Sequence, residues 1–193
     1  MRRFMTVLVA VVGGSLLTGL ACAQETNGCL LLPATKLEAF ETNTDTVIIK
    51  ATAPIGTVQG NGGEVSVRCR EITDAGTGHR ESGIVVDITL GGAVEAGLLI
   101  DYDELDSLLD GIEYLSKLDW SVTPLPDFQA VYATKGGFRA DAHGSRRTGN
   151  IEFDVRNMRL SAPKLALSRD QLGQLRSLVE QAKAKLASLR KAK

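Results

Sequence analysis

The sequence predicts an α+β fold in which two tandem ββββα repeats, each an antiparallel sheet followed by a helix, pack as a pseudo-symmetric pair. Three observations lead to this prediction. Residues 83–89 align with residues 150–156, and residues 100–113 with 167–180, at one constant spacing, as expected of a structural unit built twice. Polar and apolar residues alternate before each expected helix. Each copy then ends in apolar residues at helical spacing.

The first 23 residues have the features of a secretory signal peptide. A short basic start precedes an apolar stretch that ends in Ala21-Cys22-Ala23, a small-x-small cleavage pattern. We therefore expect residues 1–23 to be removed and the mature protein to be secreted or periplasmic, without a membrane span. Lipidation at Cys22 is the less favoured alternative, because Gly19 stands where a lipoprotein signal has a large aliphatic residue.

The mature chain is expected to form one compact domain with three parts. These are an N-terminal segment at residues 24–44, a first repeat at 45–119 and a second repeat at 120–193. Charge differs sharply along the chain: residues 24–118 contain 16 acidic and 6 basic residues, whereas residues 119–193 contain 7 and 14. Such opposite charges favour contact between the two copies or between molecules, although each surface can also simply face solvent.

Two cysteines remain after removal of the signal peptide. Because the chain is expected to enter an oxidising compartment, we predict a disulfide between Cys29 and Cys69. Closing this loop of about 40 residues would stabilise the fold by roughly 4 kcal/mol on the chain-entropy model. Two independent thiols are the alternative. No further Cys or His lies at the spacing of metal ligands, so the cysteines do not indicate a metal site.

Each repeat is expected to begin with a strand. Residues 46–52 are rich in β-branched side chains and stop before Pro54, and residues 128–134 are their counterpart. A glycine-rich turn follows each strand, at residues 60–63 and 136–137. We interpret these glycines as hairpin turns rather than as a phosphate-binding loop.

The second and third strands of each repeat alternate between polar and apolar residues, as in an antiparallel sheet with one buried face. The residues predicted to face the core are Val65, Val67, Cys69, Ile84, Val86 and Ile88 in the first copy and Phe138, Ala140, Ala142, Ile151, Phe153 and Val155 in the second. The intervening residues of each sheet are predicted to form an open polar face.

A short fourth strand leads into the helix of each copy, near residues 97–100 and 164–167. Capping-box patterns mark both helix starts, formed by Asp101 with Glu104 and by Ser168 with Gln171. The apolar stripes that follow are Leu105, Leu108, Ile112 and Leu115 in the first helix and Leu172, Leu175, Val179, Ala182, Leu186 and Leu189 in the second. Each helix can therefore cover a sheet.

Four antiparallel strands followed by a helix, twice in one chain, form a topology similar to the tandem repeats of the PUR and Whirly families of single-stranded nucleic-acid-binding proteins. The resemblance covers most of the mature chain and implies curved sheets and helices of paired units that pack together. It rests on topology, and the chain contains no sequence motif of either family. The resemblance therefore implies a fold and assigns no function or site residue.

Basic side chains on the polar faces and turns are the candidate binding residues. They are Arg68, Arg70, Arg139, His143, Arg146, Arg147 and Arg156. The arginines of this set in the second copy, together with Arg159 and with Tyr132 as a stacking ring, would suit a nucleic acid. The signal peptide, the acidic first copy and an aromatic content of 5% disfavour that interpretation.

Catalysis requires groups that converge, and the sequence offers few of them. No nucleophile elbow or zinc-binding helix accompanies His79 and His143. Asp87 and Asp154 occupy equivalent positions and could meet across a pseudo-twofold axis as an acid/base pair, with Arg139 and His143 as further groups of a small enzyme. Two surface aspartates on equivalent strands are the simpler interpretation, so we expect no catalytic residue and no cofactor.

The two expected helices carry opposite charge. The acidic run at residues 101–106 resembles a calcium-binding segment, but it lacks the glycine and the distant glutamate of an EF-hand, so we expect no metal there. Acidic residues in a first helical turn are stabilised by the helix dipole. The second helix is basic from Arg169 to Lys193. It could contact an anionic surface, but its simplest partner is the acidic first helix.

Together these patterns predict an exported, non-catalytic binding or assembly module. Its ligand is unknown, and its expected partner is another protein, an envelope component or a second copy of itself. A small periplasmic enzyme that uses residues of the polar sheet faces is the first alternative. Nucleic-acid or anionic-surface binding through the basic second repeat is the other.

Overall fold

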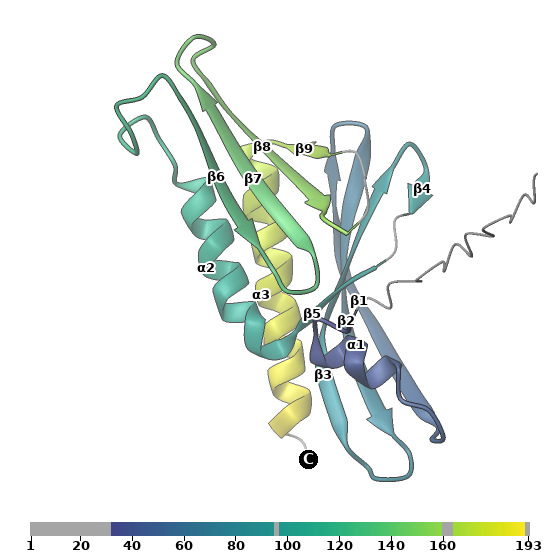
Figure 1. The fold of residues 1–193 in the computed structure, drawn as a ribbon. Coiled ribbons are helices and arrows are strands. Elements are labelled where there is room, and N and C mark those ends of the chain that lie inside the picture. The colour runs from purple at the N-terminus through teal and green to yellow at the C-terminus, as the bar shows by residue number, and fades with distance from the viewer. Residues whose placement is uncertain (1–31, 95–96, 160–163, 192–193) are drawn as a thin grey trace, which may run out of the picture. The chain divides into compact units, whose positions relative to one another are not determined.

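The computed structural model describes residues 32–94, 97–159 and 164–191 (Figure 1). The predicted signal peptide and the predicted disulfide partner Cys29 lie outside the described residues. Described first is a short helix, α1 (Lys36–Glu41), in the predicted N-terminal segment. Its N-cap Thr35 accepts a hydrogen bond from the backbone N–H of Glu38 at 3.0 Å.

The first sheet is antiparallel and contains β1 (Ile48–Gly60), β2 (Gly63–Asp74), β3 (Arg80–Leu90), the two-residue β4 (Ala93–Val94) and β5 (Leu98–Asp101). Its order is β1-β2-β3-β4, and β5 also pairs with β3. A 3-10 turn, η1 (Tyr102–Glu104), then leads into α2 (Leu105–Ser116).

The second sheet repeats this plan in the order β6-β7-β8-β9, without a counterpart of the two-residue β4. Its strands are β6 (Asp127–Ala133), β7 (Phe138–Ser145), β8 (Asn150–Asn157) and β9 (Leu165–Leu167), and α3 (Arg169–Lys191) follows. The structure therefore confirms the predicted α+β fold with two ββββα units.

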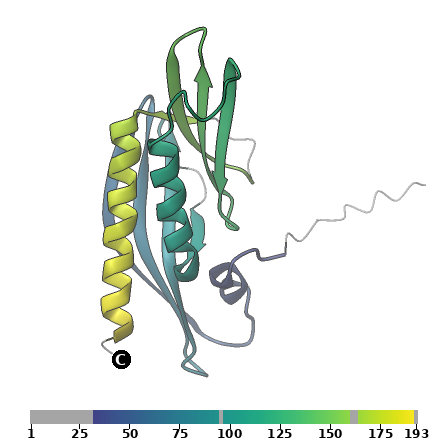
Figure 2. The ribbon, with the colours of Figure 1, turned by 90° about the vertical axis from the view of Figure 1, so that its left-hand side faces the viewer.

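The helix of each unit packs on the sheet of the other unit. α3 contacts β1, β2 and β3 of the first sheet, whereas α2 contacts β6 and β7 of the second, and the two helices lie side by side (Figures 1 and 2). Individual contacts agree with this arrangement. The Tyr132 hydroxyl of β6 donates to Ser107 Oγ of α2 at 3.1 Å, and the Cys69 sulfur of β2 lies 3.6 Å from the backbone carbonyl oxygen of Ala182 in α3. Burial raises the pKa of the Cys69 thiol.

One core joins the two units. The buried residues of both inner sheet faces, α2 and α3 form a single apolar cluster, which contains the strand residues predicted to face inward except Ile151, which is partly buried and packs against it. Burial of each large aliphatic or aromatic side chain in such a core contributes about 1.5–3 kcal/mol. The helix stripes are buried as predicted as far as Leu186, whereas Leu189 is 44% exposed.

The first strand is longer than predicted. β1 continues through Pro54 to Gly60, and its register with β2 shifts between Pro54 and Gly56. Proline lacks an N–H group, so it is tolerated in an edge strand and at a bulge, where no ladder hydrogen bond is lost. Ending the predicted strand before Pro54 was therefore wrong.

The outer face of the first sheet is also less open than predicted. Leu37 and Phe40 of α1 form a second apolar cluster with Ile72, Val85 and Leu99, which point away from the main core. The alternation in β2 and β3 predicted an open polar face. The helix that covers part of this face, α1, could not be predicted, because its segment has no clear periodic pattern.

Only one of the two predicted capping boxes forms. The backbone N–H of Ser168 donates to Gln171 Oε1 at 2.6 Å, and the N–H of Gln171 donates to Ser168 Oγ at 3.1 Å. Asp101 instead accepts hydrogen bonds from the backbone N–H groups of Lys36 at 2.7 Å and Leu37 at 3.0 Å. The carboxylate satisfies the start of α1, which the sequence pattern could not indicate.

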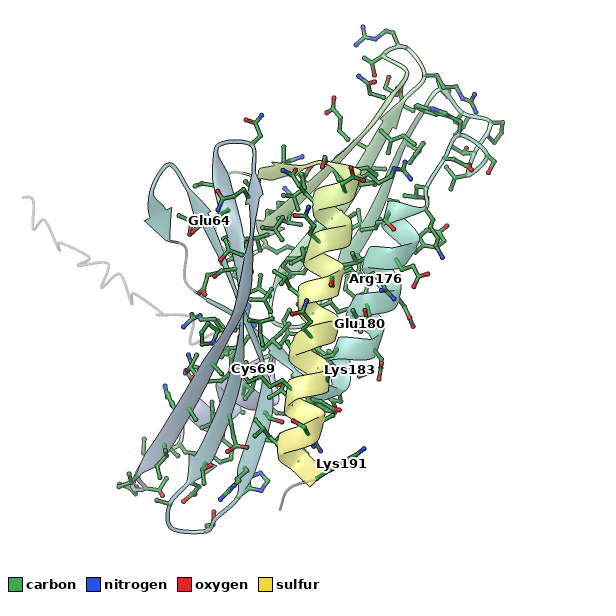
Figure 3. All side chains as sticks on the ribbon, turned by 180° about the vertical axis from the view of Figure 1, so that it is seen from behind. Glu64, Cys69, Arg176, Glu180, Lys183 and Lys191 are labelled. Carbon is green, nitrogen blue, oxygen red and sulfur yellow. The ribbon has the colours of Figure 1, made fainter. Side chains whose placement is uncertain are left out.

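The charge-opposed helices contact each other, as the sequence predicted. Arg176 of α3 lies 3.0 Å from Glu113 of α2, and Lys183 of α3 pairs with Asp106 of α2. Arg176 and Lys183 are labelled on α3 in Figure 3. Arg169 donates to the carbonyl oxygen of Leu118, just past the end of α2, at 3.0 Å. Among the described helices, none combines the length and apolar character that crossing a membrane requires.

Separating the units should remove the cover of both sheets, because each helix packs on the other unit. We expect residues 45–119 and 120–193, expressed alone, to be poorly soluble and to bind a hydrophobic dye, whereas co-expression restores a soluble complex. Solubility and thermal unfolding of each fragment measure this. Two soluble fragments that each unfold cooperatively as monomers would contradict the shared core.

Candidate binding face of the second sheet

A cluster of charged side chains lies on the outer face of the second sheet, the face that points away from α2 and α3. Because Phe138, Ala140 and Ala142 point into the core, the alternating residues of the strands point outward. We call this surface the polar face, and it comprises Gln129, Arg139, Asp141, His143, Glu152, Asp154, Arg156 and Lys164.

The strand register places like charges opposite each other. Arg139 lies opposite Arg156, and Asp141 lies opposite Asp154. Directly opposed like charges destabilise a sheet, so each carboxylate must be compensated by a neighbour along or across the strands. The polar face therefore depends on a network rather than on isolated pairs.

Asp141 is the centre of this network. Arg139 Nη2 and Nε donate to its carboxylate at 2.6–3.0 Å, and Gln129 Nε2 donates to Oδ1 at 2.9 Å. Arg156 Nε lies 3.5 Å away. Burial alone would raise the pKa of Asp141, but the hydrogen bonds from Arg139 and Gln129 and the two guanidinium charges outweigh it and lower the pKa. The hydrogen bond to Asp141 raises the pKa of Arg139.

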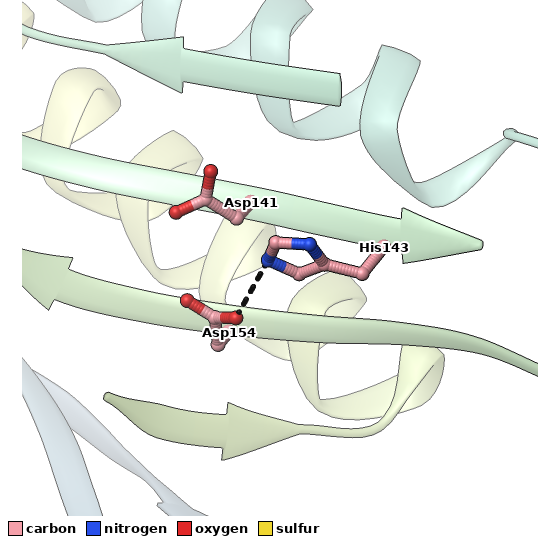
Figure 4. Close-up of side chains that lie close together, drawn as sticks. All are labelled: Asp141, His143 and Asp154. Atoms are coloured by element: carbon pink, nitrogen blue, oxygen red, sulfur yellow. Dashed lines mark ion pairs between the residues drawn. The ribbon is translucent and has the colours of Figure 1, made fainter. Parts of the chain in front are cut away.

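Asp154 is less completely satisfied. His143 Nε2 lies 3.2 Å from its Oδ2 atom (Figure 4). Lys164 Nζ lies at the same distance from this oxygen, 3.2 Å. The other carboxylate oxygen, Oδ1, is buried and has no hydrogen-bond partner, and His143 Nε2 and Arg156 Nε are also buried without a hydrogen bond. Buried polar atoms are normally hydrogen-bonded, so this end of the polar face has unused hydrogen-bonding capacity.

A cavity of about 590 Å³ adjoins this end. It lies beside β8, β9 and the start of α3, and its polar lining consists of His143, Glu152, Asp154, Lys164, Ser168 and Arg169. Apolar side chains of β8 and β9 complete the wall. The guanidinium of Arg169 lies 5.4 Å from the ring centre of Phe153. This cation–π contact positions the arginine at the edge of the cavity.

At the equivalent position in the first sheet, both carboxylate oxygens of the aspartate are hydrogen-bonded. Asp87, the repeat partner of Asp154, accepts hydrogen bonds from Arg68 Nε at 2.8 Å and Nη2 at 2.9 Å. Such a two-pronged contact satisfies both carboxylate oxygens. The strand registers place Arg68 and His143 at corresponding positions, so the two copies differ in how they hold the same aspartate.

The structure brings together three of the seven predicted binding residues, namely Arg139, His143 and Arg156. Arg70 lies in the first sheet, 3.4 Å from Glu41. Arg146 donates to the carbonyl oxygens of Trp120 and Thr123 at 2.8 and 3.1 Å, so it holds the loop before β6. Arg147 is exposed in the turn between β7 and β8.

Lys164 and Gln129 were not singled out from the sequence. The repeat contains a signal for Lys164, because its counterpart in the first copy is Gly97. A comparison of the two copies position by position therefore indicates where the second copy has acquired charge. Gln129 has no such signal, since its contact with Asp141 depends on the pairing of β6 with β7.

The donor set does not fit a resident divalent cation. Ligand-type atoms of Asp141, His143 and Asp154 lie within 4.8 Å of one another. The carboxylates, however, already contact Arg139, Arg156 and Lys164, and a divalent cation would add to this positive charge. The acidic run at 101–106 is likewise engaged, since Asp101 holds α1, Asp103 lies 2.7 Å from Lys36, and Asp106 pairs with Lys183.

Comparisons with known proteins give little further information. No protein-family model matches the chain, and no curated protein matches it. Among solved structures it is similar to the plant transcriptional regulator PBF-2, with 12% sequence identity, a TM-score of 0.31 and coverage of 77% of this chain and 87% of that one. A likeness of this degree carries no argument about function.

Proposed function

We propose that this protein is an exported, non-catalytic binding module that holds its ligand at the His143 end of the polar face and in the adjoining cavity. The observation that carries the proposal is Asp154, which is 8% exposed and keeps one carboxylate oxygen without a hydrogen-bond partner. Leaving such an atom unsatisfied costs about 1–3 kcal/mol. A ligand that donates a hydrogen bond there would recover part of this cost.

The surrounding groups define the chemistry of the ligand. Asp154 and Glu152 accept hydrogen bonds, Lys164 donates them, and apolar side chains of β8 and β9 line the rest of the wall. A polyhydroxylated molecule fits this combination, because its hydroxyl groups donate and accept and its ring faces are apolar. The cavity volume lies within the range of small-ligand sites. We therefore propose a sugar unit of an envelope polymer as the ligand class.

The binding test uses the mature protein and two soluble probes, N-acetylglucosamine oligomers and muropeptides. We expect NMR titration to shift the amide signals of His143, Asp154 and Lys164. Asp154→Ala should weaken binding by about tenfold to a hundredfold, the loss expected for a hydrogen bond to a charged group.

Asp87→Ala is the matched control, because it removes the same residue type from the equivalent strand of the first sheet. It should leave the affinity for the probes unchanged, whatever it does to stability. Equal losses for the two variants, or the absence of shifts around Asp154 with both probes, would overturn the proposal.

The alternatives receive less support. Asp87 pairs with Arg68 in the first sheet, so it does not join His143 and Asp154 as a second carboxylate of an enzyme site. Ser168 lines the cavity, but its Oγ accepts the capping hydrogen bond at the start of α3. On the basic helix, Arg169, Arg176 and Lys183 are directed to α2, which leaves less charge for an anionic surface.

A further inference from the structure

Exposed sheet edges attract other strands, and most edges of this protein are protected. β1 contains Pro54 and a register shift, which interrupt a regular edge. β4 has only two residues. The turn after β6 lies against β5, since Gly136 packs directly against the backbone carbonyl of Leu99. β9 has three residues, and its Ala166 carbonyl accepts a hydrogen bond from Asn61 at 3.0 Å.

β6 has none of these protections. It is a regular strand of seven residues, and no charged residue or proline follows Asp127 within it. In the described part of the chain, no strand pairs with β6 on the side away from β7. Natural proteins blunt such edges unless a partner covers them.

The hydrogen-bond pattern shows which backbone groups are available. Thr134 donates to Phe138 at one end of the β6–β7 pair, and Arg146 donates to Pro126 at the other. Because bonded positions alternate in an antiparallel pair, the even-numbered residues of β6 bond β7. The N–H and C=O groups of Gln129, Val131 and Ala133 therefore point outward.

Exposed apolar side chains lie beside this edge. Val131 on the strand is 48% exposed, and Tyr114 on the adjacent α2 is 62% exposed. Val122 and Leu125 are exposed in the loop that leads into β6, and a cavity of about 430 Å³ lies between this loop and α2. Exposed apolar patches of this kind mark interaction surfaces.

We propose that β6 pairs antiparallel with β6 of a second copy of this chain, so that the two second sheets form one continuous sheet across a twofold axis. A twofold axis requires antiparallel pairing of identical strands. The pairing uses the backbone groups that point away from β7. It shares Gln129 with the polar face, but only through the backbone of that residue, and it does not require the proposed ligand.

The sequence of β6 suits this self-pairing when Ala130 lies on the axis. Phe128 of one copy then lies opposite Tyr132 of the other on the side of the sheet that faces α2, and aromatic residues are favoured at such paired strand positions. Asp127 begins the strand and Lys135 follows its end. Antiparallel pairing therefore brings the carboxylate of one copy near the ammonium group of the other at both ends.

Sedimentation equilibrium of the mature protein tests the proposal. We expect a mass twice that of one chain, and Val131→Lys should reduce it to that of a single chain, because a charge at the centre of an edge opposes pairing. Val47→Lys is the matched control: Val47 is also an exposed valine, but it lies just before β1, and its substitution should leave the dimer intact.

Amide hydrogen exchange tests the register without a substitution. Exchange at Gln129, Val131 and Ala133 should slow as protein concentration rises, while the even-numbered residues of β6, which already bond β7, should not change. A single-chain mass at millimolar concentration, a dimer that survives Val131→Lys, or exchange at the odd-numbered positions that is independent of concentration would each overturn the proposal.

Discussion

Asp141→Ala is expected to lower the free energy of unfolding at pH 7 by about 3–5 kcal/mol, the effect of removing one partner from a buried ionic network. The Asp141 side chain is fully buried and holds both Arg139 and Arg156. Without it, two guanidinium groups face each other across the strands with no carboxylate between them. Denaturant unfolding monitored by circular dichroism measures the loss.

Asp127→Ala is the control for this prediction, because it removes an exposed aspartate from the same sheet. At a protein concentration too low for the proposed pairing of β6, it should change stability by no more than about 0.5 kcal/mol. The contribution of Asp141 should also depend on pH. Its folded-state pKa lies below the ordinary value of about 3.9. The contribution is therefore present above pH 4 and is lost as pH falls through the folded-state pKa.

Asp141→Asn separates charge from packing, since the amide keeps the shape of the side chain. We expect the stability difference between this variant and the wild-type protein to shrink as pH falls below about 4, because the wild-type carboxylate becomes protonated as well. A difference that stays constant to strongly acidic pH would show that Asp141 acts through packing alone.

Gly111→Ala is expected to destabilise the protein by about 1–3 kcal/mol. A Cβ atom at Gly111 would lie 2.3 Å from Cδ2 of Tyr132, close to the stem of the ring, so the β6 side chain would have to shift. This clash should outweigh the gain of about 1 kcal/mol that alanine brings to a helix interior. Gly111 lies where α2 contacts the second sheet.

Gly173→Ala is the matched control, because Gly173 lies in α3 and a Cβ atom there meets nothing within 4 Å. It should raise stability by up to about 1 kcal/mol. Opposite signs for the two substitutions, measured by denaturant unfolding, are expected if α2 packs on β6 as described. A stabilising Gly111→Ala would contradict that contact.

The proposed binding site could be predicted from the sequence only in part. Alternation placed Arg139, His143 and Arg156 on one face of the second sheet, because side-chain direction in a strand follows from the period of two. It did not indicate that Asp141 and Asp154 would lie opposite each other, since this depends on the register of β7 with β8. The sequence predicts Arg70 and Arg146 as binding residues, but in the structure both contact distant segments: Arg70 lies near Glu41, and Arg146 donates to loop carbonyls.

The sequence by itself determined the repeated ββββα architecture, the inward residues of both sheets and the charge-opposed helix pair. These features follow from local periodicity and from the self-similarity of the chain, which a single sequence contains in full. Only the tertiary structure decided which sheet each helix covers, that α1 closes the outer face of the first sheet, and that Asp154 keeps an unsatisfied oxygen. Such outcomes depend on packing between segments far apart in the chain, and no local pattern encodes them.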